Sequence, residues 1–113
     1  MNIYYYVDER SRNPVKEFID SLPPAEQAKV FAYIEELKEQ GYNLRRPLAG
    51  YLGEGIYELR PKSNRIFYFF FMKDNVVLIH CLRKKTDKIP TKDLDLCKKR
   101  KLQVERSRKI VKI

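Results

Sequence analysis

Four cationic side chains stand where predicted β-strands begin or end, between residues 55 and 90. This stretch contains GIYELRP, then NRIFYFFFM, then NVVLIHCLRKKTDKIP, which predicts three strands in succession. The four cations lie on adjacent strands of one predicted sheet: Arg60, Arg65, Lys84 and Lys85. Fixed positive charge on a rigid sheet can hold a phosphate and stabilise charge that develops on it during a reaction. RNA or DNA is therefore the first substrate class to consider.

Such cations suit cleavage of RNA without a metal ion. The ribose 2′-OH is an internal nucleophile beside the phosphate, so the protein has to orient it, remove its proton and neutralise the phosphate. Arg and Lys stabilise the phosphorane, and Lys, Tyr, His or Glu can transfer protons. The sequence indicates no metal site and no cofactor, because one His and two distant Cys lack metal-ligand spacing. The segment GYLGEG also lacks the Lys-Ser/Thr ending of a phosphate loop.

Arg65 is the strongest candidate for a phosphate contact, because it opens a strand and precedes a wholly apolar run. An ion pair with Glu58 on the neighbouring strand is its alternative role. Glu58 and Arg60 share one face of their strand by alternation, so Glu58 can hold an arginine in place. Lys84 or Lys85 ends the third strand and can reach the scissile phosphate; a solvated strand end is the alternative for each.

His80 is the one imidazole and a candidate for proton transfer. A lone His in an apolar strand is more often a hydrogen-bonded core residue, and strict alternation places it on one face with Leu78 and Leu82. Tyr57, on the face opposite Glu58, can stack on bases or belong to the core. The other candidates for RNA binding are Glu58 and five basic residues: Arg83, Lys88, Lys92, Lys98 and Lys99.

The composition predicts one globular domain over residues 1–113. Of these residues 43% are hydrophobic and 35% charged, which is typical of a water-soluble protein with a charged surface. No apolar run is long enough for a membrane helix, and MNIYYYVDER lacks the layout of a signal peptide. We therefore expect a cytoplasmic protein without a membrane partner, in which Cys81 and Cys97 are free packing residues.

Positive charge is concentrated at the C-terminal end. Residues 1–82 contain 11 Lys and Arg and 11 Asp and Glu, whereas residues 83–113 contain 13 and 4 and carry the whole net charge of +9. A neutral body with a basic end favours contact with a polyanion or an acidic partner, and a solvated tail is the alternative. Residues 106–113 are expected to be a tail of doubtful order.

The elements that position these residues follow the order β-α-α-β-β-β-α. A Tyr-rich strand precedes two helices that begin at Pro14 and Pro24, the first capped by Asn13. Residues 42–54 are expected to form a loop before the three strands, and a last helix opens near Pro90. The order predicts an α+β fold with an antiparallel-rich sheet, an N-terminal helical hairpin on one face and a basic C-terminal helix. The other face of the sheet is expected to be left for function.

Two of the helices have apolar faces that the spacing predicts. The second helix is expected to bury one set of side chains and the last helix a narrower set. These sets are Ala28, Phe31, Ile34 and Leu37, and then Leu94, Cys97 and Leu102.

The phrases LAGYLGEGIYELRPKSNRIFYFFF and VVLIHCLRKKTDKIP resemble the RelE/HigB toxin superfamily, and within it the phage-derived HigB-like branch. The most specific pieces are residues 55–60, Arg65 at the start of the next strand, and Lys84-Lys85-Thr86 with Pro90. The resemblance implies a toxin of a type II toxin–antitoxin pair that enters the ribosomal A site and cleaves translated mRNA without a metal. It also implies a cognate antitoxin, for which we expect a helix-turn-helix DNA-binding domain.

The resemblance assigns roles to individual residues. Arg65 falls where the family has its phosphate-binding strand arginine, and Lys84 or Lys85 where the family has a basic residue ending the last strand. Arg60 supplies a further cation, and the basic C-terminal helix fits ribosomal RNA. Two departures leave the general base unassigned: no Tyr follows position 68, and Glu58 stands where some members have Lys.

Three functions stay open at this point. The chain can be a ribosome-dependent mRNA endonuclease, a non-catalytic RNA- or partner-binding module of similar fold, or a gyrase-poisoning toxin like the ParE branch. The strand-end cations favour the first over the third, because RNA cleavage needs them at those positions. They do not separate the first from the second, since binding uses the same charges.

Overall fold

The two N-terminal helices begin at prolines, as the sequence predicts. In the computed structural model, which describes all residues from 1 to 113, helix α1 spans Pro14–Asp20 and helix α2 spans Pro24–Gln40. The Asn13 side chain caps α1 by accepting a hydrogen bond of 3.0 Å from the Lys16 backbone N–H. Gly41 ends α2 with a positive φ of 51°, a conformation that glycine adopts without steric cost.

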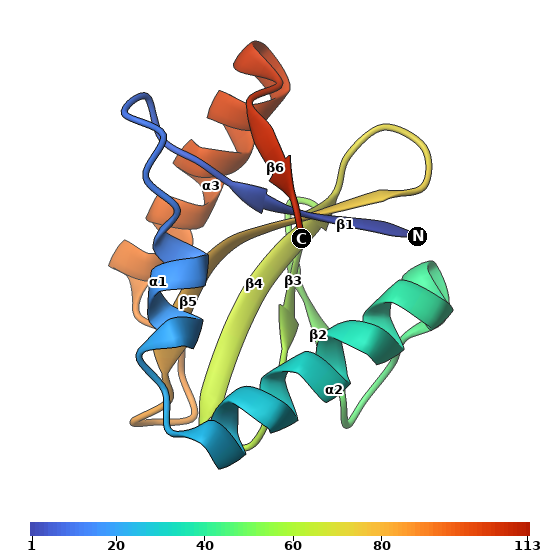
Figure 1. Cartoon of the computed structure of the whole chain (residues 1–113), viewed down its shortest axis with the longest axis vertical. Helices are drawn as coiled ribbons and strands as arrows, with labels where there is room; N and C mark the ends of the chain where they lie inside the picture. Colours follow the sequence, from blue (N-terminus) through green and yellow to red (C-terminus); the bar gives the residue numbers. More distant parts are fainter.

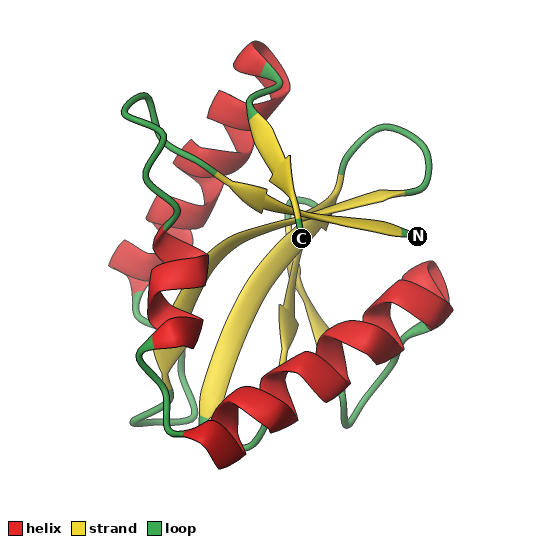
Figure 2. Cartoon of the chain, viewed as in Figure 1, coloured by secondary structure: helices red, strands yellow, loops and turns green.

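Six strands form one twisted sheet in the order β2-β3-β4-β5-β1-β6 (Figure 2). Strand β1 pairs in parallel with β5, and all other pairs are antiparallel. The bounds are β1 Asn2–Tyr6, β2 Ala49–Gly53, β3 Ile56–Leu59, β4 Asn64–Phe70, β5 Asn75–Arg83 and β6 Ile110–Lys112. The predicted α+β class is confirmed. The two edge strands, β2 and β6, lie in the segments from which the sequence predicts a loop and a tail.

Helices cover both faces of this sheet (Figure 1). Helices α1 and α2 pack on one face, which we call the hairpin face, and helix α3 (Thr91–Ser107) packs on the other, the α3 face. Strand β4 is buried along nearly its whole length because side chains on both of its sides are covered. The expectation that the second face is left for function is therefore wrong, since Cys97 and Val104 of α3 pack on it.

Two predicted apolar faces differ from the observed ones. Helix α3 buries Cys97 and Val104, which are two turns apart, whereas Leu102 is 46% exposed. Helix α2 buries Val30 with Ile34 and Leu37, and Phe31 is 42% exposed. In both helices the direction that faces the sheet is set by how the helix docks, which the helix's own spacing does not determine.

The two cysteines lie on opposite sides of the sheet. Cys81 belongs to the core cluster under the hairpin face and Cys97 to the cluster under α3, so the sheet separates the two thiols. Burial raises the pKa of both thiols, that of Cys97 to about 12, which keeps them protonated and unreactive. None of the three helices is both long and apolar enough to cross a membrane.

The docking of α3 can be tested by truncating one side chain. Val104→Ala removes two methyl groups from a fully buried position, so we expect the free energy of unfolding to fall by about 2 kcal/mol. Leu102→Ala is the matched control on the same helix and should change stability by less than about 0.5 kcal/mol, because Leu102 is exposed. Chemical denaturation measures both; equal losses in the two variants would contradict the observed docking.

Candidate functional site

A buried carboxylate joins two of the predicted cations on the α3 face. Glu58 lies on β3 and is only 5% exposed, and its Oε2 accepts hydrogen bonds from Arg60 Nη2 at 2.8 Å and Arg60 Nε at 3.1 Å. Its Oε1 lies 3.6 Å from Arg65 Nε, an ion pair without a hydrogen bond. The pairing of Glu58 with Phe67 places Arg65, two residues earlier on β4, on the same face. The ion pair with Glu58, the alternative role of Arg65, is therefore present, and Glu58 also holds Arg60 in place.

Arg65 is held rigidly and keeps donors free. Its Nη1 donates to the carbonyl oxygens of Lys62 at 2.7 Å and Asn64 at 2.8 Å, while Nη2 makes no hydrogen bond within the chain. Burial lowers the pKa of the Arg65 guanidinium from its ordinary value; Glu58 opposes this shift, and the positive charge of Arg60 adds to it. Arginine remains charged at neutral pH even so. The guanidinium is thus a fixed charge, and because Arg65 is only 8% exposed, little of it is open to solvent.

The Arg60 side chain packs against the edge strand β2 at the position of Gly50. Gly50 is paired with Glu58, and a Cβ at Gly50 would stand 2.9 Å from Arg60 Nη2. No side chain on β2 therefore occupies the place that the guanidinium fills. The absence of a side chain at Gly50 is what allows Arg60 to reach Glu58 along the sheet edge.

The predicted lysines follow β5 directly and lie next to this cluster. The Lys84 backbone N–H donates to Ser63 O at 2.6 Å, which joins the two strand ends, and Lys84 Nζ pairs with the exposed Asp87 at 3.0 Å. Lys85 is exposed and makes no ion pair. A pocket of about 250 Å³, which we call the lysine pocket, opens here; among its lining residues are Lys84, Lys85, Lys88, Lys92 and Asp93. A phosphate entering this pocket meets several ammonium groups, of which that of Lys84 is paired with Asp87.

His80 faces α3 together with Leu82, as alternation predicts, but not together with Leu78. A bulge in the β4–β5 ladder lets Phe67 pair with His80 and Tyr68 with Leu78, so His80 and Leu78 do not share a face. The His80 ring stacks on Phe67 at 5.6 Å, with Nε2 2.8 Å from Asp93 Oδ1 and Nδ1 3.3 Å from Arg100 Nη1. It thus joins β5 to α3, and through Asp93 it reaches the wall of the lysine pocket.

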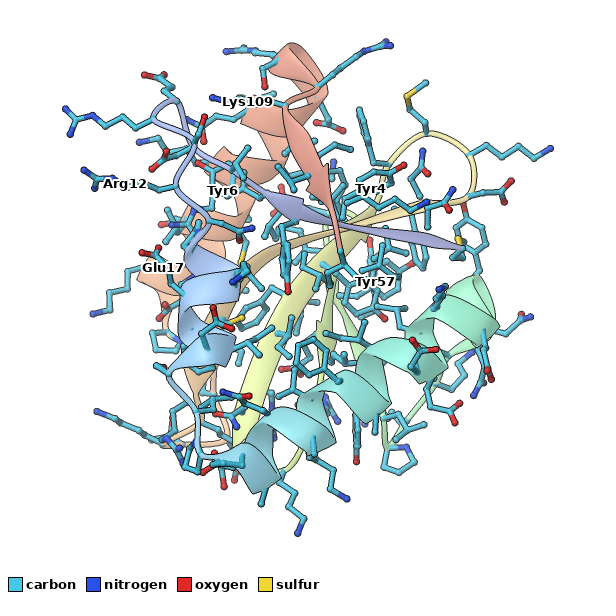
Figure 3. The ribbon with its side chains drawn as sticks, viewed as in Figure 1. Tyr4, Tyr6, Arg12, Glu17, Tyr57 and Lys109 are labelled. Atoms are coloured by element: carbon cyan, nitrogen blue, oxygen red, sulfur yellow. The ribbon has the colours of Figure 1, made fainter.

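The remaining predicted residues are not brought together with the cluster. Tyr57 lies on the hairpin face, between the sheet and α2 (Figure 3). Arg83 turns to the same side and bonds Glu26 of α2 at 2.8 Å. On α3, Lys98 pairs with Glu54 at 2.7 Å, and Lys99 lies in a separate solvent-filled groove near Asp8 and Glu9.

Several residues of the site carry no signal in the sequence. These groups reach the site only because the folded chain brings them there: the Lys62 carbonyl, the missing side chain of Gly50, and the carboxylates of Asp87 and Asp93. Glycine beside a strand is the one signal that could have indicated a close approach of another group. No three His, Cys, Asp or Glu side chains lie close enough together to hold a metal ion.

Comparisons with known proteins agree with this architecture. The model of the family described as "Phage derived protein Gp49-like (DUF891)" matches residues 17–102, about three quarters of the chain. A chain in the crystal structure of the archaeal RelE–RelB complex from Pyrococcus horikoshii OT3 superposes with a TM-score of 0.55 at 21% identity, covering 75% of this chain and 98% of that one. This likeness confirms the RelE-like fold. No curated protein matches the sequence.

The environment of His80 can be measured directly, because it is the chain's one histidine. Burial lowers its pKa from the ordinary value of 6.5; the hydrogen bond to Asp93 opposes this shift and the charge of Arg100 adds to it. We expect an NMR titration of the imidazole with a midpoint below 6.5. Asp93→Asn should lower the midpoint further and Arg100→Gln should raise it. Shifts of the same sign in both variants would contradict the observed contacts.

The same shift predicts how stability depends on pH. Because the folded-state pKa of His80 lies below the unfolded value, the unfolded chain binds more protons between the two values. The contribution of His80 is complete above about pH 6.5 and falls as the pH drops toward the folded-state pKa. His80→Gln is the control, and its unfolding free energy should lose that part of the pH dependence.

Proposed function

The chain belongs to the phage-derived Gp49-like family, and on this premise we propose that it is the toxin of a type II toxin–antitoxin pair that cleaves mRNA on the ribosome. The observation that carries the proposal is Arg65, anchored by two carbonyl oxygens and Glu58, with Nη2 free to bind a phosphate. Lys84 and Lys85 lie at the adjacent strand end. The resemblance of these positions to the RelE/HigB superfamily adds support.

In the proposed reaction the ribose 2′-oxygen attacks the neighbouring phosphorus and the bond from phosphorus to the 5′-oxygen breaks. The products are a 2′,3′-cyclic phosphate and a 5′-hydroxyl. The 2′-OH loses its proton to a base, and the leaving 5′-oxygen gains one. Arg65 and Arg60 neutralise the non-bridging oxygens, and Lys85 or Lys84 stabilises the leaving oxygen. His80 acts indirectly, by holding Asp93 at the wall of the lysine pocket.

The proposal includes three partners. The basic residues that lie outside the cluster, among them Lys88, Lys92, Lys98 and Lys99, are assigned to ribosomal RNA, and mRNA is the substrate. The archaeal protein of similar fold comes from a RelE–RelB complex. We propose that this chain likewise forms a complex with a cognate antitoxin, which covers its basic residues. A helix-turn-helix DNA-binding domain in that antitoxin and a cytoplasmic location complete the proposal.

Mapping RNA 5′ ends tests the activity. Purified protein is incubated with mRNA, with and without programmed ribosomes, and chelator is added to the free-RNA samples. We expect cuts within the A-site codon only when ribosomes are present. Intact mRNA in both samples would contradict the proposal, and a DNA-supercoiling assay would then separate a gyrase poison from a binding module.

Substitutions at the site separate catalysis from binding. Arg65→Ala and Lys85→Ala should each lower the cleavage rate by roughly 10²–10³-fold, the loss typical of removing one donor that stabilises a developing oxyanion. Affinity for ribosomes should change far less. Lys73→Ala is the matched control, because Lys73 is exposed in the turn at the opposite ends of β4 and β5.

The two variants also guard against a folding artefact. Arg65→Ala leaves Glu58 with one partner and can lose stability, whereas Lys85 is exposed and unpaired, so its removal leaves the fold intact. If cleavage and ribosome affinity fell together in Lys85→Ala, the residue would serve binding alone and the catalytic assignment would be wrong.

A further inference from the structure

A second site lies on the hairpin face, where the edge strand β2 meets the loop after α2. It is a pocket of about 540 Å³ that we call the aromatic pocket, lined chiefly by Tyr42, Arg45, Arg46, Tyr51 and Tyr57. We propose that the aromatic pocket binds a nucleobase of single-stranded RNA. The inference rests on the proposed function in one respect, that the base belongs to the same strand whose phosphate lies at Arg65.

The rings of the pocket are fixed from one side and open on the other. Tyr42 is 53% exposed and packs on Phe70 with 4.2 Å between ring centroids; Tyr51 is 58% exposed and packs on Tyr57 at 4.8 Å. Tyr57 in turn stacks on the buried Tyr68 at 5.4 Å. A base that stacks on these rings therefore meets a rigid platform, with little side-chain entropy left to lose.

The charged residues that line the pocket are two arginines, Arg45 and Arg46. Arg45 Nη1 donates to the Tyr42 carbonyl at 2.7 Å and so holds the turn, while Arg46 is exposed and makes no ion pair. No Asp or Glu lines the pocket. Open aromatic rings beside an unpaired arginine are the combination with which proteins bind the bases and backbone of single strands.

The aromatic pocket and the Arg60–Arg65 cluster lie on the two faces of the same edge. Gly50 contributes to the pocket wall, and on the α3 face a Cβ at Gly50 would stand 2.9 Å from Arg60 Nη2. Arg60 borders this edge directly, and Arg65 on β4 lies two strands in from it, about 10 Å away at the usual strand spacing. An RNA strand with a phosphate at Arg65 can therefore round the edge at β2 and place a nearby base on Tyr42. This continuity favours RNA over a protein segment as the occupant.

Binding of a short fluorescein-labelled oligouridine to the free protein tests the pocket by fluorescence anisotropy. Loss of one base stack costs about 1–3 kcal/mol, so Tyr42→Ala should weaken binding by roughly 5- to 150-fold. Tyr42→Phe keeps the ring and should bind as the unmodified protein does. Phe31→Ala removes an exposed ring outside the pocket and should also have no effect.

The salt dependence separates stacking from charge. Arg46→Gln should reduce the slope of log K against log salt by about 0.7, the value for one phosphate of a single strand. Tyr42→Ala should leave this slope unchanged. Unchanged RNA affinity in Tyr42→Ala would overturn the inference. If that variant binds RNA normally but has lost affinity for the antitoxin, the pocket is a protein-docking site instead.

The cleavage assay distinguishes failure of this inference from failure of the proposed function. A protein that cuts no mRNA but shows the Tyr42-dependent oligouridine binding refutes the nuclease and supports the pocket. A protein that cuts mRNA on ribosomes while Tyr42→Ala binds oligouridine normally refutes the pocket alone.

Discussion

The buried carboxylate of Glu58 is the contact on which the candidate site depends. Two guanidinium groups placed side by side repel each other, and a carboxylate out of water is costly unless it is paired. Glu58 offsets the repulsion between the two guanidinium groups and is itself paired, because Arg60 and Arg65 each approach a different oxygen of its carboxylate. The three residues thereby hold one another in a single arrangement with a net positive charge. A site fixed in this way needs no reorganisation when an anion enters.

The double coverage of the sheet explains why the cations lie at strand ends. With α1 and α2 on one face and α3 on the other, the interiors of β4 and β5 are buried on both sides and admit little but apolar groups. Polar side chains are confined to the strand ends and to the sheet edge, where Arg65, Lys84 and Arg60 stand. The one imidazole inside this region, His80, is tied by hydrogen bonds to α3. Functional groups are therefore few; backbone carbonyls hold Arg65, and Glu58 holds Arg60.

Much of this arrangement was predictable from local pattern, and the rest depended on long-range pairing. Alternation along β3 correctly separates Glu58 from Tyr57, because that strand is regular. Alternation fails between Leu78 and His80, where a bulge shifts the register of β5, and no residue type in that run signals a bulge. Strand β2 was expected to be a loop because its Gly-rich sequence has little preference for a strand; pairing with β3 creates it. Helix spacing likewise placed Leu102 in a stripe that the docked helix turns outward.

The unpredicted strand β2 changes what the sheet can do. An exposed edge strand is ordinarily a liability that proteins cover or charge. Here its position 50 lacks a side chain, so Arg60 lies against one side of the strand while the tyrosines of the aromatic pocket gather on the other. A sheet whose faces are both buried offers a ligand no broad surface, but its edge is accessible from both sides. A small molecule can occupy only one of the two sites, whereas a flexible chain of phosphates and bases can occupy both. For the proposed RNA ligand, the geometry of this edge is therefore a more specific argument than the net charge.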